Sequence, residues 1–410
     1  MNIKTRMPRI EAFLFFVFLA SPLLYIPGYL ELSIKLRFLV LLSLSLAVLA
    51  TVPLRQKLAK NYRHLPKALR IFVVVTTSMM ALSVLRQSDY LTVAIGNPPE
   101  FLGLLAWLSF IVLALTWMDD VDRLLLGKTS LGIGIAAMVA SLYFGLFYIG
   151  LGLRLPGILL QATSMGMYAS MFCLISFYGL ARATRCNDSI VATLGVIGSV
   201  TVLLLSQSRI GYLTLIIVLA AYAALTVRKR FQVAVLAVSI VVLVGLVPRL
   251  FPSYFERFGS ASIDRGVSYR LDLYRTTLPD VLRHNSIIGN GPSSLPTAIN
   301  NQNTVPEPIK RSLQTGELFA STHDLYFDVA YFFGGLAALA LLGASGYALF
   351  VGWRIRDLQI DTLRLIFITL IINACFNVPS LTLTSLYFVV LFGLLATTHK
   401  PKRSNDSRKI

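Results

Sequence analysis

Apolar runs of membrane-spanning length recur from one end of this 410-residue chain to the other. Hydrophobic residues make up 56% of it and charged residues 14%, which leaves too little polar surface to cover a soluble protein of this length. Backbone groups in lipid must bond to one another, and the alternating pattern of a membrane barrel is missing from the sequence, so each run is expected to be a helix. The sequence therefore predicts an all-α, polytopic integral membrane protein.

We expect about twelve transmembrane helices, because that many runs have a length suited to the hydrocarbon core. Nine precede the one long polar segment, 249–322, and three follow it. The predicted organisation is helices 1–9 in 1–248, an external loop with short helices in 249–322, helices 10–12 in 323–398, and a basic tail in 399–410. The predicted spans lie near residues 12–30, 38–54, 71–85, 101–117, 131–149, 164–181, 189–206, 210–227, 231–248, 325–350, 365–377 and 381–398.

The positive charge of the chain indicates its orientation rather than a nucleic-acid partner. The net charge is +18, from 37 Lys and Arg against 19 Asp and Glu, and the basic residues gather at the ends of apolar runs. Alternate loops differ strongly in Lys and Arg content, and the basic set belongs in the cytoplasm by the positive-inside rule. Both termini are then predicted to be cytoplasmic and the long loop external.

Within the long loop the sequence predicts a helix followed by a tight turn. Leu271, Tyr274, Leu278, Val281 and Leu282 recur at helical spacing, which favours an amphipathic helix with this stripe on the outer rim of the bundle. Ile288-Gly289-Asn290-Gly291 then reads as a turn whose two glycines adopt positive φ.

Two residues next to external helix ends are candidates for chemistry. His323, where the loop re-enters the membrane, can take a proton from a hydroxyl; a hydrogen-bonded interfacial histidine is the structural alternative, and His284 is the competing base on this side. Arg209, at the tip between two spans, suits a phosphate or pyrophosphate; snorkelling to lipid headgroups is its alternative. Arg270, on the flank of the predicted loop helix, has a similar choice, and its sequence context by itself favours a solvated surface residue or a salt-bridge partner over a phosphate ligand.

The sequence predicts no catalytic metal and no cofactor. The acidic residues of the loop form no close Asp-x-Asp pair, no His-x-x-x-His occurs, and the three cysteines imply no disulfide framework. A phosphate-binding loop of the Gly-Lys-Ser/Thr type is also missing, so ATP is not expected to be the energy source.

Four short motifs occur in order along the chain: Ser208-Arg209 at a helix start, Arg270 within Tyr269–Tyr274, the Ile288–Gly291 turn, and His323–Tyr326 followed by Phe333–Leu336. In combination, order and spacing, they resemble the O-antigen ligase and O-antigen polymerase superfamily of bacterial membrane glycosyltransferases, over roughly residues 160 to 350. Family members commonly carry Asn where this chain has Asp324.

The resemblance implies a glycosyltransferase in the bacterial inner membrane, with its active site facing the periplasm. The donor would be a glycan on undecaprenyl pyrophosphate and the acceptor lipid A-core, without metal or cofactor. Arg209 and Arg270 would bind the pyrophosphate, and His323 would be the general base of an inverting transfer. Residues expected to support the site are Asp324, Gly289, Gly291 and Tyr274.

Two other functions stay open from the sequence. A polymerase would use the same donor to extend a polysaccharide; one dominant external loop favours the ligase. A transporter or flippase for lipid-linked polysaccharide is the alternative of a different class, since about twelve helices with both ends inside is also a carrier plan.

Overall fold

The computed structural model describes residues 3–27, 29–85, 89–96, 101–150, 155–159, 161–226, 231–250, 260–283, 287–292, 294–295, 299, 322–352, 357–377 and 380–397. Regular structure in these ranges is helical, with no strand among them. The predicted all-α, polytopic membrane class is confirmed.

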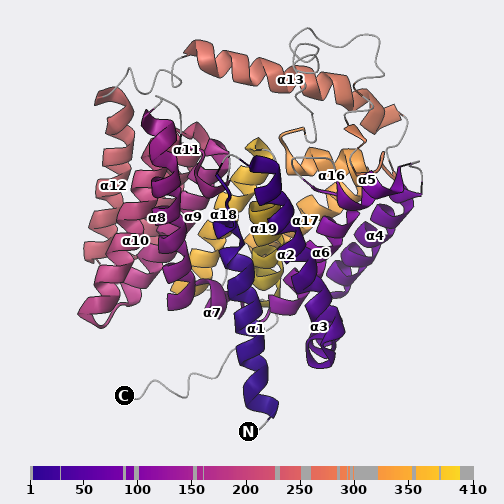
Figure 1. Ribbon diagram of the computed structural model, residues 1–410, viewed down its shortest axis with the longest axis horizontal. Helices are drawn as coiled ribbons and strands as arrows, with labels where there is room; N and C mark the ends of the chain where they lie inside the picture. Colours follow the sequence, from indigo (N-terminus) through magenta and orange to yellow (C-terminus); the bar gives the residue numbers. More distant parts are fainter. Residues whose placement is uncertain are drawn as a thin grey trace.

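The helices form a bundle, and one of them, α13, lies across an end of it (Figure 1). We call this the α13 end; α1 begins and α3 lies at the opposite end. The helices are α1 Ile3–Ala20, α2 Leu30–Ala50, α3 Val52–His64, α4 Lys67–Val84, α5 Tyr90–Ile95, α6 Leu104–Trp117, α7 Val121–Leu125, α8 Lys128–Gly150, α9 Ala162–Arg182, α10 Cys186–Ser206, α11 Arg209–Thr226, α12 Phe231–Leu250, α13 Ser260–Arg283, α16 Leu325–Phe333, α17 Gly335–Gly352, α18 Leu358–Phe376 and α19 Leu381–Thr397, with short 3₁₀ turns η1 Ser21–Leu23 and η2 Gly157–Leu159.

Five described helices are long and apolar enough to cross a membrane, and the pair α3–α4, bent by 116°, would be a sixth span. Five further apolar helices are shorter than a full span: α6, α17, α19 and the described apolar parts of α11 and α12. The multi-pass character is therefore clear, whereas the number of twelve spans and the predicted domain boundaries stay predictions.

The first two predicted spans have the wrong boundaries. The first helix ends at Ala20 rather than near residue 30, because Pro22 and the segment after it leave the helical path as η1. The second helix begins at Leu30 rather than near residue 38, since its charges are accommodated: Lys35 pairs with Glu31 at 2.5 Å. The guanidinium of Arg37 is 5% exposed and donates to the carbonyls of Pro22 and Ile158, so it ties η1 to η2.

The predicted span 325–350 is wrong as a single helix. It is broken into α16 and α17 at Gly334, whose φ of 92° ends α16. The apolar composition on both sides gave no sign of this break. It allows α16 to lie beneath α13 while α17 descends into the bundle (Figure 1).

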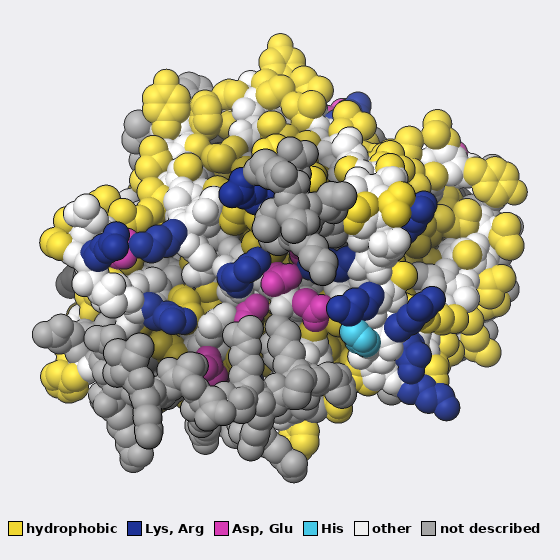
Figure 2. Space-filling model, turned by 90° about the horizontal axis from the view of Figure 1, so that it is seen from below, with side chains coloured by type: hydrophobic (Ala, Val, Ile, Leu, Met, Phe, Trp, Pro, Cys, Tyr) yellow, Lys and Arg dark blue, Asp and Glu magenta, His cyan; other side chains and the backbone are white. Residues whose placement is uncertain are grey.

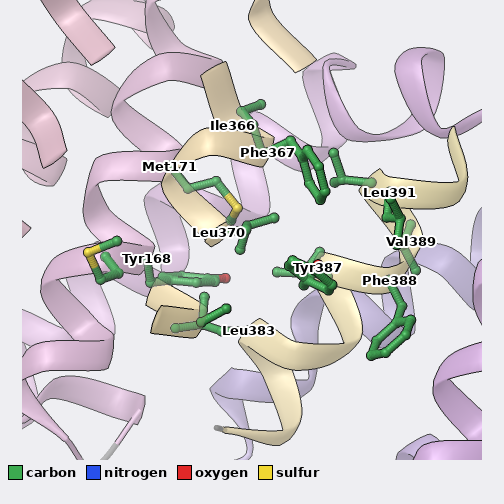
Figure 3. Close-up of a cluster of buried hydrophobic side chains, with 14 of the residues drawn as sticks. Tyr168, Met171, Ile366, Phe367, Leu370, Leu383, Tyr387, Phe388, Val389 and Leu391 are labelled. Carbon is green, nitrogen blue, oxygen red and sulfur yellow. The ribbon is translucent and has the colours of Figure 1, made fainter. Parts of the chain in front are cut away.

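A large part of the buried core lies where α9, α18 and α19 meet. Every side chain of α19 is buried. Figure 3 shows Tyr168 and Met171 of α9 facing Phe367 and Leu370 of α18, with Tyr387 of α19 beside them. Burial on all sides explains why α19 is apolar around its whole circumference. This packing fixes the end of α18, which takes part in the candidate site.

Candidate functional site

All three candidate residues lie at the α13 end of the bundle. Helix α12 rises to this end before α13, so α11, which is joined to α12 by a short connection, begins there with Arg209. Arg270 lies on α13. His323 directly precedes the helix-capping residue of α16, and α16 lies beneath α13 (Figure 1).

A tight turn between α10 and α11 positions Arg209. Gln207 closes α10 with a left-handed φ of 49°, and the Ser208 hydroxyl accepts from the amide of Gly211 at 3.1 Å, which caps α11. Helix α9 packs directly against this turn: a Cβ at Gly166 would come 2.4 Å from Cβ of Ser208. Small residues thus hold the start of α11 against α9.

His323 has a φ of 66°, and it is one of three described non-glycine residues with positive φ. Such a conformation costs about 1–3 kcal/mol and persists only where its surroundings enforce it. The next residue, Asp324, caps α16: its Oδ1 accepts from the amides of Tyr326 at 2.8 Å and Phe327 at 3.0 Å. Asn and Asp are equally good helix caps, so the family's usual Asn and this chain's Asp324 can perform the same structural task.

Sequence reasoning missed the residue that fixes the backbone before His323. Asp328 is 1% exposed, and its Oδ1 accepts from both the amide (2.7 Å) and the hydroxyl (2.8 Å) of Thr322. The signal available was a carboxylate inside an apolar stretch, since a buried carboxylate requires donors. Thr322, just before His323, is therefore anchored to Asp328 in the first turn of α16.

Arg270 spans from α13 to the end of α18. Its Nη2 donates to the backbone carbonyl of Phe376 at 2.7 Å, which satisfies one of the orphan carbonyls at a helix C-terminus. One turn further along α13, the ring of Tyr274 stacks on Phe327 of α16 with centroids 5.1 Å apart. These two contacts fix the face of α13 that lies over the start of α16.

Electrostatic effects link His323 to Arg270. Burial and, to a smaller extent, the positive charge of Arg270 together lower the pKa of His323 to about 4. Burial also lowers the pKa of Arg270 itself, partly offset by Tyr274 and Asp324, although a guanidinium remains charged at neutral pH. Burial raises the pKa of Asp324, against the hydrogen bonds it accepts. At neutral pH the site thus holds a neutral imidazole near a fixed positive charge.

The predicted turn after α13 is confirmed, and it seals the end of α16. Gly289 and Gly291 have φ of 79° and 86°. The amides of Asn290 and Gly291 donate to the carbonyls of Tyr331 (2.8 Å) and Phe332 (2.9 Å). A Cβ at Gly289 would lie 2.5 Å from backbone atoms of Phe332 and Gly334, so only glycine fits this close approach.

The predicted apolar stripe of α13 is wrong in part. Leu273 is fully buried, as are the side chains one and two turns later, Thr277 and Val281, whereas Leu271 is 46% and Leu278 41% exposed. The hydroxyl of Thr277 donates to the carbonyl of Leu273 at 2.9 Å, so threonine can enter an apolar interface without an unsatisfied donor. The prediction from apolar residues alone was therefore right for Val281, but it included the exposed Leu271 and Leu278 and missed Leu273 and Thr277.

Beneath His323 lies a buried network of hydroxyl groups that the sequence did not indicate. The Tyr326 hydroxyl is 2.9 Å from that of Tyr387, and the Tyr387 hydroxyl bonds to Ser345. These residues belong to α16, α19 and α17, respectively. The network locks the rotation of α16 and thereby the direction in which its capped end presents His323.

Among the residues that the structure describes, no group of three or more His, Cys, Asp or Glu could hold a metal ion. The competing base, His284, lies outside the described residues, as does most of the loop after residue 299. In the described part of the chain, Arg270 and His323 interact, whereas Arg209 is placed only at the same end of the bundle.

Fold and site together define an all-α, polytopic membrane protein with a cationic site at one end of its helical bundle. A protein-family model described as O-antigen ligase matches residues 194–342, the segment that contains Arg209, Arg270 and His323. This segment is therefore similar to the O-antigen ligase superfamily, and the similarity points to a glycosyltransferase-like ligase activity. A search of curated proteins finds no match to the chain.

Proposed function

We propose that this protein is an O-antigen ligase, which transfers O-antigen polysaccharide from undecaprenyl pyrophosphate to lipid A-core at the periplasmic face of the bacterial inner membrane. The observation that carries the proposal is the position of Arg270 and His323 over the start of α16, within the segment that matches the ligase family. Arg209 begins a helix at the same end of the bundle.

The proposed reaction is a single inverting displacement. The acceptor hydroxyl oxygen attacks the anomeric carbon as the bond from that carbon to the pyrophosphate oxygen breaks. His323, neutral at pH 7, takes the hydroxyl proton, and the electron pair of the broken bond leaves on undecaprenyl pyrophosphate. Arg209 and Arg270 hold the leaving group, whose negative charge grows in the transition state.

The electrostatics of the site support these roles. A pyrophosphate anion next to Arg270 would counter the positive charge that lowers the pKa of His323, so donor binding would make the imidazole a stronger base. Arg270 contacts a backbone carbonyl, and its guanidinium keeps further N–H donors for phosphate oxygens. The donor carries its own leaving group, and no metal or nucleotide enters the mechanism.

The periplasmic placement is supported by the charge pattern of the sequence, which assigns the more basic loops to the cytoplasm. A single cysteine introduced near Asn301, in a cysteine-free background, should react with a membrane-impermeant thiol reagent in cells permeabilised only at the outer membrane. Labelling that requires lysis of the inner membrane would reverse the orientation.

The experiment that tests the function is a lipopolysaccharide gel from a strain in which the gene is deleted. A ligase predicts lipid A-core without attached polysaccharide, while the polymer accumulates on its lipid carrier. Attachment of single repeat units would instead indicate a polymerase with the same donor. An unchanged gel would refute both.

A further inference from the structure

A cavity lies at the opposite end of the bundle from the candidate site. It has a volume of about 570 Å³, and it is bounded by α7, the start of α8, the end of α9, the start of α10 and the first turn of α18. Figure 2 views this end of the molecule and shows Lys and Arg side chains gathered around a few acidic ones. Arg209, Arg270 and His323 are not among the residues that line this cavity.

Three cations line this cavity: Arg123, Lys128 and Arg182. Lys128 pairs with Asp188 at 2.6 Å. Arg182 donates to the hydroxyl of Tyr178 at 2.7 Å rather than to a carboxylate, and the contact of Arg123 with Asp120 is long, at 3.7 Å.

Of the two lining carboxylates, Asp188 is the partner of Lys128, and Asp122 accepts from the side-chain amide of Gln359 at 2.8 Å. Two arginines thus keep donors for an anion. The start of α8 adds to this potential, because it has no acidic residue in its first turn. The first turn of α10 contains Asp188, so that helix adds less.

One wall of the cavity is apolar and continues onto the lipid-facing side of the bundle. Leu131 and Val191 belong to that wall. Val191 is 41% exposed, and Leu194 and Ile197, one and two turns further along α10, are 53% and 56% exposed. Helix α10 is one of the helices long and apolar enough to cross a membrane, so this exposed face contacts acyl chains.

We propose that this cavity binds an anionic phospholipid, with its phosphate between Arg123, Lys128 and Arg182 and an acyl chain along Val191, Leu194 and Ile197 of α10. The charge selects an anion, and the adjoining apolar face selects an anion that carries a hydrocarbon chain. The inference concerns binding at the opposite end of the bundle and stands independently of the proposed transfer reaction.

The test measures binding of phosphatidylglycerol to the purified full-length protein in phosphatidylcholine-containing micelles by native mass spectrometry. The variant Arg123→Gln/Arg182→Gln should bind it more weakly, by roughly fivefold for each cation removed. The matched control is Arg55→Gln/Lys67→Gln, which removes two exposed charges that do not line the cavity and should bind as the wild type does.

The proposal is overturned if both double variants weaken binding equally, because charge in general would then be responsible. It is also overturned if the cavity variant binds unchanged, or if glycerol 3-phosphate competes as well as the lipid, which would make the ligand a soluble phosphate. A photoreactive phosphatidylglycerol, applied to the unaltered protein, gives a check independent of variant folding: its crosslinks should fall within 126–131 or 191–197, and crosslinks elsewhere contradict the site.

Discussion

The opposite end of the bundle and the candidate site use their charged residues in different ways. At the opposite end, cations meet carboxylates: Lys57 pairs with Glu11 and, at 2.9 Å, with Asp120, and Arg364 pairs with Asp361 at 2.6 Å. The contacts of Lys57 join α3 to α1 and to the segment before α7. The contact of Arg364 links two residues within one turn of α18.

At the candidate site the carboxylates bond to the backbone and a hydroxyl instead. Asp324 caps α16, Asp328 holds Thr322, and Arg270 donates to the carbonyl of Phe376. A carboxylate engaged with backbone donors does not neutralise a neighbouring arginine by direct pairing. The ion pairs of Lys57 and Arg364 thus serve stability. Under the proposed function, the charge of the candidate site, like that of Arg123 and Arg182 in the lipid cavity, is kept available for an anionic ligand.

The largest effect on activity is expected when the proposed general base of the candidate site is removed. His323→Ala should lower transfer by roughly 100- to 10,000-fold while leaving donor affinity nearly intact. Arg209→Ala should weaken donor binding and transfer together, and Arg209→Lys should restore only part, since an ammonium keeps the charge but loses the bidentate geometry. Both quantities can be measured with purified donor and acceptor. Wild-type transfer by His323→Ala would make the histidine structural.

A second pair of variants compares one cation from each region. Arg270→Gln should reduce transfer by roughly 100-fold, because an interaction with the departing pyrophosphate is lost. The loss of its hydrogen bond to the carbonyl of Phe376 should cost only about 1 kcal/mol of stability. Lys57→Gln should do the reverse: it removes the cation that Glu11 shares with Asp120 and costs roughly 1–3 kcal/mol of unfolding free energy, with transfer per folded molecule unchanged. If both variants changed transfer and stability to the same extent, the two regions would not differ in how they use their cations.

The backbone of the candidate site can be tested through its glycines. Gly289→Ala places a methyl group against the backbone of Phe332 and Gly334 at a φ of 79°, and should cost roughly 2–4 kcal/mol of stability. Gly343→Ala is the matched control, since its Cβ would meet no atom within 4 Å and alanine favours a helix. Equal melting temperatures for the two variants would show that the turn is not tightly packed.

The pH dependence of transfer should report the effect of Arg270 on His323. In the free enzyme the pKa of His323 is about 4, so the active, neutral form is complete at pH 7 and is lost only as the pH falls through that value. Bound pyrophosphate adds negative charge and raises this pKa. The acidic limb of kcat should therefore lie at higher pH than that of kcat/KM. The reverse order would contradict a pyrophosphate bound beside His323.

The smallest effect is expected at the cap of α16. Asp324→Asn keeps an oxygen that can accept from the amides of Tyr326 and Phe327, and should leave stability and transfer close to wild type. Asp324→Ala loses the cap, which costs about 1 kcal/mol. A large loss of transfer in Asp324→Asn at unchanged stability would give this carboxylate a chemical role instead.

The sequence by itself determined what depends on neighbouring residues and on composition. Apolar runs predicted the all-α membrane class, and the turn around Gly289 followed from local glycine chemistry. These predictions succeed because lipid forces each span to satisfy its own backbone and because glycine favours positive φ wherever it stands. The prediction of one continuous helix over 325–350 failed at Gly334, because the residues on both sides of the break are equally apolar.

Only the tertiary structure decided how the candidate residues are held. The contact of Arg270 with Phe376 and the hydroxyl network of Tyr326 and Tyr387 join residues far apart in the chain. The buried face of α13 was likewise set by its neighbours, which admitted Thr277 and left Leu271 exposed. The spacing of apolar residues limits the buried face of a helix to a few adjacent stripes of side chains. The stripe that is buried, and the direction in which a capped end presents its histidine, depend on packing between helices that no local pattern records.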